Sequence, residues 1–190
     1  MTLEKNKSQV ITSYVAGLTA LAIVLKLRYF EIPYPPAPFL KYDVSGVPLA
    51  SIMFLMPKSI VPALLIYYII HVALGADLIG MAMKCLAELS TITPLVMLYR
   101  RLTRYSRQFH VHILVSISVI SRVITMLIAN IIVTPHWMLI ARWASTYEEA
   151  LRKTFALIPH IILFNATLGI IISLISIMVF DVLKKTGLMR

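Results

Sequence analysis

The chain has 190 residues, a mean hydropathy of +0.87, only 14% charged residues and a formal net charge of +10 at pH 7. Soluble domains carry roughly 25% charged residues, so this composition excludes an ordinary soluble protein. The positive charge does not indicate nucleic-acid binding, because a membrane protein uses basic residues first to set its topology. A single cysteine, Cys85, excludes a disulfide framework.

Six apolar segments follow one another and predict transmembrane helices. The last two, residues 113–133 and 160–180, are each long enough to cross a hydrocarbon core of about 30 Å. The second, VSGVPLASIMFLM, is short for a full span. The other three are expected from about Val10 to Leu27, from after Lys58 to about Ala76, and from Leu78 to Tyr99. We therefore expect an all-α polytopic membrane protein, a six-transmembrane-helix bundle with a short second segment, forming a single integral membrane domain over residues 1–190.

The polar connections set the expected topology. A proline-rich loop, RYFEIPYPPAPFLKYD, follows the first helix, and TPHWMLIARWASTYEEALRK (134–153) separates the last two. Four arginines fall in the short loop RRLTRYSR, and basic residues concentrate in cytoplasmic loops. We therefore expect a multi-pass protein of the plasma membrane with both termini cytoplasmic. The proline-rich loop and the loop of residues 134–155 would face outward.

Two charged residues lie near the end of the proline-rich loop. Lys41 and Asp43 are expected to stay solvated or to pair across the start of the second helix. Asp43 is also suited to cap that helix, because acidic residues are favoured at a helix N-terminus.

Motifs of common catalytic and metal sites do not occur in the sequence. It has no G-x-x-x-x-G-K-[ST] loop, no H-E-x-x-H, no cysteine pair and no G-x-S-x-G. His110 and His112 have no carboxylate nearby and are interpreted as residues of the membrane interface. An enzyme is therefore possible but unsupported by these residues, and we predict no catalytic residue, metal site or cofactor.

Charged side chains inside apolar helices are candidates for a functional site, because charge at membrane depth costs free energy. Lys84 and Glu88 stand four residues apart on one helix face. That spacing fits an internal ion pair, and a ligand-facing role of Lys84 fits equally well. Arg122 has no acidic residue in its own segment, so it is expected to face a cavity, Glu88 or a partner subunit.

Two pairs of uncharged residues each allow two interpretations. Asn130 and Asn165 lie toward the outer ends of their segments, either as clamps between helices or as hydrogen-bonding groups of an outward-facing pocket. Ala16 and Ala20 are one helical turn apart and permit a close helix contact. That contact is either within the chain or with a separate membrane subunit.

Three motifs in order resemble the substrate-binding S components of energy-coupling-factor (ECF) vitamin transporters, most of all the riboflavin-type members. FLKYDVSGVP (39–48) is similar to the family's F-L-K-x-D-x-S-D-x-P, NIIVTP (130–135) to its Asn followed by Thr-Pro, and FNATLG (164–169) to its P-F-N-x-x-K-G. The chain departs from these patterns at Gly46, Leu163 and Leu168, where the family has Asp, Pro and Lys.

The resemblance implies a six-helix bundle that binds a vitamin near its outer face, under the loop before the second helix, which acts as a lid. Asn130 and Asn165 match positions that hydrogen-bond the ligand, and Ala16 and Ala20 match the A-x-x-x-A that contacts the coupling subunit. Partners would be a transmembrane coupling subunit, two cytoplasmic ATPases that hydrolyse ATP, and the lipid bilayer, with no nucleic acid. The expected ligand-binding residues are Phe39, Leu40, Lys41, Tyr42, Asp43, Lys84, Asn130, Phe164, Asn165 and Thr167.

We therefore expect a high-affinity substrate-capture subunit of an ATP-driven importer, binding riboflavin or a related flavin in an outward-facing pocket. Ring stacking would come from Phe39, Tyr42, Phe164 or Trp137. Leu168 suggests one alternative, an S component for another small vitamin or a nucleobase-like ligand. The other alternative is a membrane enzyme or structural subunit outside transport, with Lys84, Glu88 and Arg122 as its polar centre.

Overall fold

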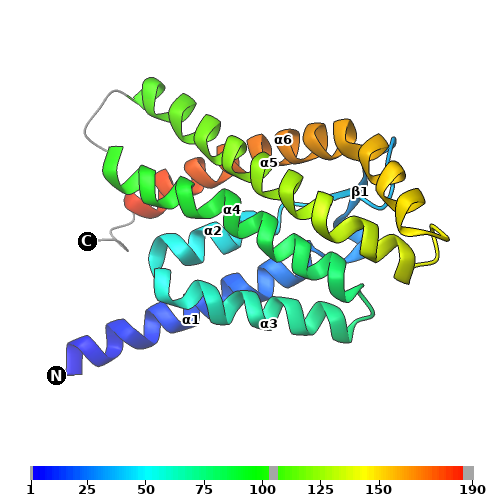
Figure 1. Ribbon diagram of the computed structural model, residues 1–190. Coiled ribbons are helices and arrows are strands. Elements are labelled where there is room, and N and C mark those ends of the chain that lie inside the picture. Colours follow the sequence, from blue (N-terminus) through cyan, green and yellow to red (C-terminus); the bar gives the residue numbers. More distant parts are fainter. Residues whose placement is uncertain (1, 103–106, 186–190) are drawn as a thin grey trace.

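The computed structural model describes residues 2–102 and 107–185, and in these residues the chain forms six α-helices (Figure 1). Two short 3-10 helices and one antiparallel pair of two-residue strands complete the described structure. The α-helices are α1 Thr2–Leu25, α2 Gly46–Leu55, α3 Ile60–Ala73, α4 Leu78–Leu102, α5 Arg107–Ile140 and α6 Tyr147–Lys185. The other elements are η1 Arg28–Phe30, β1 Ile32–Pro33, β2 Lys41–Tyr42 and η2 Pro57–Ser59.

The helices run alternately from one end of the bundle to the other (Figure 1). α1 begins and α6 ends at one end, which we call the terminal end. The connections 26–45, 74–77 and 141–146 gather at the opposite end, the loop end. α5 packs along both α4 and α6, while α2 contacts α1, α4 and α6.

Three described helices are long and apolar enough to cross a membrane by length and composition: α4, residues 111–140 of α5, and α6. The remaining apolar helices are shorter. α2 has 10 residues and rises about 15 Å, half of a ~30 Å hydrocarbon core. The short second segment is therefore present, but by this measure the described residues contain three spans rather than the expected six.

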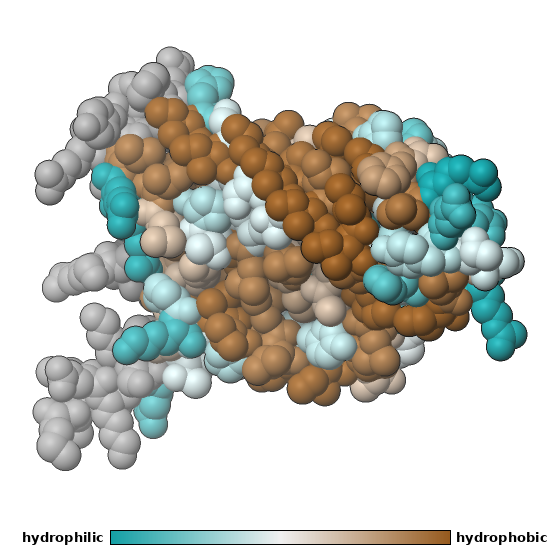
Figure 2. Space-filling model, in the orientation of Figure 1, coloured by the Kyte–Doolittle hydropathy of each residue, from teal (hydrophilic) through white to brown (hydrophobic). Residues whose placement is uncertain are grey.

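Apolar side chains on the outside of the bundle fit a lipid environment. Five isoleucines of α5 are 40% to 60% exposed and recur every three or four residues along one helix face: Ile117, Ile120, Ile124, Ile128 and Ile132. Apolar residues predominate across the middle of the face in Figure 2, whereas hydrophilic residues gather toward its two ends. In water such an apolar stripe would be buried against a core, so its exposure supports a membrane location.

α5 and α6 extend well beyond the predicted apolar segments. The stretch 134–153, expected to be a polar connection, is helical except for residues 141–146. The hydroxyl of Thr146 accepts a hydrogen bond from the backbone N–H of Glu149 (3.2 Å), whose carboxylate accepts one from the backbone N–H of Ser145 (2.8 Å). These bonds resemble a capping box, so T-x-x-E at 146–149 is the start signal that hydropathy alone overlooked. α1 likewise begins at Thr2, earlier than the predicted Val10.

The two ends of the bundle are filled differently. At the terminal end, Phe54 of α2 stacks on Phe180 of α6 with ring centroids 4.0 Å apart, and Tyr99 of α4 contacts both rings edge-on. α2 stops at Leu55 because Met56 leaves helical geometry (φ −144°, ψ 86°) before Pro57. The loop end contains a cavity.

Candidate ligand-binding site

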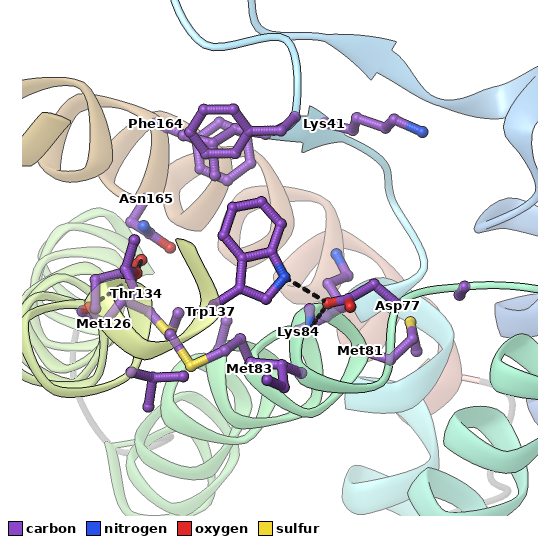
Figure 3. Close-up of a pocket in the computed structure, with 18 of the residues that line it drawn as sticks. Lys41, Asp77, Met81, Met83, Lys84, Met126, Thr134, Trp137, Phe164 and Asn165 are labelled. Carbon is purple, nitrogen blue, oxygen red and sulfur yellow. Dashed lines mark hydrogen bonds between the residues drawn. The ribbon is translucent and has the colours of Figure 1, made fainter. Parts of the chain in front are cut away.

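A cavity of about 520 Å³ lies at the loop end, between α4, α5, α6 and the loop of residues 26–45. Small-molecule sites typically measure roughly 300–1,000 Å³. Its apolar lining includes four methionines, Met81, Met83, Met126 and Met138, and the rings of Phe39, Phe164 and Trp137. Figure 3 shows the indole of Trp137 across the middle of this space, with Phe164 on one side and Met83 on the other.

Seven of the ten predicted ligand-binding residues line the cavity: Phe39, Leu40, Lys41, Lys84, Asn130, Phe164 and Asn165. The other three lie outside the lining. The hydroxyls of Tyr42 and Thr167 are 2.8 Å apart and join the loop to α6, and Asp43, near the end of the loop, is buried at 4% exposure. The structure thus gathers residues from four distant parts of the sequence around one space.

The loop of residues 26–45 covers the cavity and is attached at several points. β1 and β2 pair antiparallel within it, with Ile32 opposite Tyr42. Tyr34 contacts α6 through His160, whose Nδ1 is 3.3 Å from the Tyr34 hydroxyl. Tyr34 also packs with Ala37, Phe164 and Leu168 in a buried apolar cluster. These contacts hold the loop closed over the bundle.

Glu31 ties the two sides of this loop together. Its carboxylate forms ion pairs with Lys26 and with Lys41, the latter at 2.6 Å. Burial by itself would raise the pKa of Glu31. The hydrogen bonds and charges of Lys26 and Lys41 outweigh that effect and hold this pKa below its ordinary value. Lys41 therefore pairs with Glu31 and not with Asp43, which corrects the expected pairing of Lys41.

A buried charge cluster joins the loop to two helices, α4 and α5. The Lys84 ammonium lies 2.9 Å from Asp43 Oδ2 and 2.7 Å from Glu88 Oε1. Arg122 Nη1 lies 3.5 Å from the same Glu88 oxygen, and Arg122 itself is 1% exposed. The predicted Lys84–Glu88 pair is thus present, and Arg122 faces both Glu88 and the cavity. We call Asp43, Lys84, Glu88 and Arg122 the buried charge cluster.

Asp43 is the loop residue of this cluster and is not solvated. Burial would raise the pKa of Asp43, but the Lys84 charge and hydrogen bonds from the hydroxyl and backbone N–H of Ser45 hold it below its ordinary value. Ser45 also contacts the hydroxyl of Tyr67 at 2.9 Å. Asp43 therefore anchors the base of the loop, and Ser45, not Asp43, occupies the N-cap position of α2.

The two asparagines have different partners. Asn165 accepts a hydrogen bond from Arg122 Nε (3.1 Å) and donates one to the carbonyl of Ile161 (2.9 Å), so it clamps α6 to α5 and also lines the cavity. Asn130 donates to the carbonyl of Met126 and accepts from Thr134. Both of these partners belong to α5, so these two hydrogen bonds of Asn130 do not clamp two helices.

The mouth of the cavity contains residues that sequence reasoning left out or mentioned only in passing. Trp137 donates a hydrogen bond from its indole N–H to Asp77 Oδ2 (3.1 Å), which Figure 3 marks with a dashed line. Trp137 also packs edge-on against Trp143 with ring centroids 4.9 Å apart, and Phe39 of the loop contacts both indoles. Neither Asp77 nor the four methionines belong to a sequence motif. The sequence therefore holds no local signal that these residues line a cavity.

Leu168 stands where the family pattern has Lys, and its place changes the meaning of that departure. It is 1% exposed and packs with Tyr34 and Ala37 under the loop. It is not among the residues that line the cavity. The replacement of Lys by Leu at position 168 therefore changes the packing of the loop on α6 and not the lining of the cavity.

Ala16 and Ala20 lie on an exposed face of α1. Beside them, a shallow groove runs along the helix, lined by residues that include Tyr14, Gly17 and Leu21. Within the described residues no group of three or more His, Cys, Asp or Glu is arranged to hold a metal ion.

Comparison with solved structures identifies a related fold. A chain from a structure of the S component of a bacterial ECF transporter aligns with a TM-score of 0.72 and 22% sequence identity, covering 94% of this chain and 98% of that chain. At this level of identity, the likeness shows a shared fold. No protein-family model matches the chain, and no curated protein matches its sequence.

Proposed function

We propose that the chain is the substrate-capture subunit of an ATP-driven importer of the ECF type and that riboflavin or a related flavin is its ligand. One observation carries the proposal: in a chain that shares its fold with an S component, a cavity of about 520 Å³ lies beneath the loop of residues 26–45. The protein captures the ligand and does not transform it.

The lining of the cavity suits a flat ring with polar edges. Methionine side chains are flexible and polarizable, so Met81, Met83, Met126 and Met138 adapt their surface to a ring system. Phe164 and Trp137 offer aromatic faces for stacking. Asn130 and Asn165 supply hydrogen bonds at the ring edge, and Lys84 contributes its side chain to the cavity wall. A few polar groups in an apolar cavity are the usual composition of a selective small-molecule site.

The exposed face of α1 fits the expected partner of such a subunit. Ala16 and Ala20 leave room for a transmembrane coupling subunit to approach the α1 backbone closely. In this proposal the coupling subunit connects the chain to two cytoplasmic ATPases. Both termini of the chain are cytoplasmic, and the loop end faces outward to receive the vitamin at the plasma membrane.

Ligand extraction and thermal stability test the proposal. Protein purified in mild detergent should contain a co-purified flavin by mass spectrometry, and added riboflavin should raise the melting temperature of flavin-free protein. A melting temperature raised by a nucleobase or another vitamin, but not by riboflavin, would replace the flavin with the alternative ligand class.

Co-expression tests the assignment to a transporter. The chain should co-purify with a coupling subunit and an ATPase pair encoded in the same genome. Ala16→Leu should abolish this association and leave riboflavin binding unchanged, whereas Thr12→Leu, on the exposed face one turn earlier, serves as a nearby control. Failure of the wild-type chain to associate with any coupling subunit would reject the transport role.

A further inference from the structure

The charged groups around the cavity balance one another. Five charged residues line it, and the cations among them form ion pairs with three further carboxylates. The four cations are Lys26, Lys41, Lys84 and Arg122, and the four carboxylates are Glu31, Asp43, Asp77 and Glu88. A net charge on a bound ligand would unbalance this partly desolvated region, which costs free energy.

Arg122 reaches the cavity with spare hydrogen-bonding capacity. Its Nε donates to Asn165, and its Nη1 donates to Thr91 (2.9 Å) and lies near Ala87 O (3.3 Å) and Glu88 (3.5 Å). Within the described residues, Nη2 has no hydrogen-bond partner. Because a guanidinium carries five N–H groups and a buried donor without a partner is costly, this edge of Arg122 is suited to a ligand acceptor.

The other polar groups at the inner end of the cavity are also donors. Asn165 has one amide N–H left after its bond to Ile161, whereas the Lys84 ammonium is buried between Asp43 and Glu88 and neutralises them rather than facing the cavity. The second oxygen of Glu88 lies against Gly46 of α2, and Glu88 is not among the lining residues. The inner end of the cavity therefore presents N–H groups, since Glu88 Oε2, which has no hydrogen-bond partner among the described residues, lies against α2 and not at the cavity.

Electrostatics selects among possible acceptors. A ligand carboxylate would satisfy these donors but would add a negative charge to a cluster whose two cations already have two carboxylate partners. A carbonyl oxygen or a ring nitrogen satisfies the same donors without adding charge. The inner end therefore favours an uncharged acceptor.

The mouth of the cavity has the opposite polarity. Asp77 Oδ2 accepts hydrogen bonds from the backbone N–H of Gly80 and from the indole of Trp137. Its second oxygen has no hydrogen bond to the described residues, and Asp77 lines the cavity. A ligand hydroxyl is suited to this oxygen, while a phosphate or carboxylate would be repelled by it.

We propose that the cavity binds an uncharged ligand in one orientation, with carbonyl or ring-nitrogen acceptors at Arg122 and Asn165 and a hydroxyl-bearing end beside Asp77. The proposal rests on the cavity being the ligand site of the proposed function. It deepens that function by assigning Arg122 to the ligand and by stating the ligand's charge and polarity.

A panel of probes tests the charge of the ligand on the wild-type protein. Riboflavin and hypoxanthine are uncharged and rich in acceptors, biotin carries one carboxylate, and thiamine is a cation. Melting temperature and tryptophan fluorescence should respond to at least one of the two uncharged probes and to neither charged one. A protein stabilised by neither uncharged probe, or best by biotin or thiamine, overturns the proposal.

Riboflavin and its 5′-phosphate test the orientation. The two share one ring, and the phosphate replaces the terminal hydroxyl that the proposal puts beside Asp77. The phosphate should bind at least tenfold more weakly, and Asp77→Asn should recover about tenfold while keeping an oxygen for the Trp137 N–H. Equal binding of the two flavins, or no effect of Asp77→Asn on their ratio, would contradict the orientation.

Arg122→Lys tests the assigned donor. Lysine keeps the charge balance but lacks the forked guanidinium, so riboflavin should bind about tenfold more weakly or worse. Arg142→Lys, at an exposed residue of the 141–146 connection, is the matched control and should bind as the wild type does. The probe panel needs no variant, so the proposal stays testable if Arg122→Lys fails to fold.

The outcomes separate this proposal from the proposed function. If hypoxanthine binds and riboflavin does not, the flavin assignment fails and the uncharged, acceptor-bearing class stands. If riboflavin binds with unchanged affinity in Arg122→Lys, the flavin assignment stands and the role of Arg122 is rejected.

Discussion

The ammonium of Lys84 lies 2.9 Å from the carboxylate of Asp43 and joins the loop that covers the cavity to the helix that forms its wall. The same ammonium lies 2.7 Å from Glu88, which in turn contacts Arg122. Because these groups are buried, each depends on its partners to compensate its charge. The position of the loop and the shape of the cavity wall are therefore parts of one electrostatic unit.

Asp43→Asn should destabilise the protein strongly. It removes one of two carboxylate partners of buried Lys84, and breaking a buried pair typically costs about 3–5 kcal/mol. Lys153→Met removes the exposed Lys153–Glu149 pair and should lower the melting temperature far less, because water screens exposed charges. Thermal unfolding in detergent measures the stability of both variants. Equal decreases in melting temperature would show that the buried ion pair stabilises the fold no more than the exposed one.

Gly46→Ala should be destabilising, whereas Gly17→Ala should not. A Cβ at Gly46 would overlap the Glu88 carboxylate and lie 2.8 Å from Ile172 Cδ1, but a Cβ at Gly17 would meet nothing within 4 Å. Alanine in an open helical position stabilises by about 0.5–1 kcal/mol, since glycine loses more backbone entropy on folding. The two melting temperatures should therefore move in opposite directions. A Gly46→Ala protein as stable as the wild type would mean that α2 and α4 separate easily.

Trp137→Phe should speed both binding and release of riboflavin. The substitution keeps an aromatic ring but removes the hydrogen bond from α5 to Asp77 in the 74–77 connection. Trp143→Phe is the matched control, since no hydrogen bond of its indole is seen among the described residues. Stopped-flow measurement of flavin fluorescence gives both rates. Similar acceleration in both variants would assign the effect to ring size rather than to the Asp77 bond.

Asn130→Ala and Asn165→Ala should differ in stability more than in binding. Each should weaken riboflavin about tenfold, one hydrogen bond's worth. Asn165→Ala should also lower the melting temperature, because it leaves Arg122 Nε without its partner, whereas the partners of Asn130 lie in its own helix. Calorimetry and thermal unfolding test the pair. Unchanged affinity in either variant removes that residue from the site.

The pH dependence of stability should report on Glu31. Its pKa in the folded protein lies below the ordinary value of 4.5, so its ion pairs stabilise the folded state fully above about pH 4.5. That contribution is lost as the pH falls through the lowered pKa. The melting temperature of the wild type should exceed that of Glu31→Gln by a constant amount above pH 5, and the difference should vanish in acid. Asp43 is present in both proteins, so its contribution to the pH dependence cancels in the difference between the two melting temperatures. A difference in melting temperature that grows in acid would contradict a lowered pKa of Glu31 in the folded protein.

Several features were predictable because their signals are local. The apolar runs around residues 113–133 and 160–180 predicted helices at those positions, and Lys84 and Glu88 at helical spacing predicted an ion pair that the structure contains. Helix ends were less accurate, since hydropathy reports the thickness of the membrane and not the capping of Thr146 and Glu149 beyond it. The six expected helices are present and the second is short, at 10 residues, but six membrane spans are not confirmed by helix length and composition.

The sequence by itself determined that the chain is apolar, helical and built around a few charges too costly to leave unpaired in an apolar setting. Only the tertiary structure decided which charges meet: Lys41 with Glu31, Lys84 with Asp43, and Arg122 with Glu88 and Asn165. The periodicity of a helix can be recognised from residues that are close together in the sequence. These pairs come from the covering loop, α4, α5 and α6, and only the packing of those elements brings them within a few ångströms and leaves the donor edge of Arg122 at the cavity.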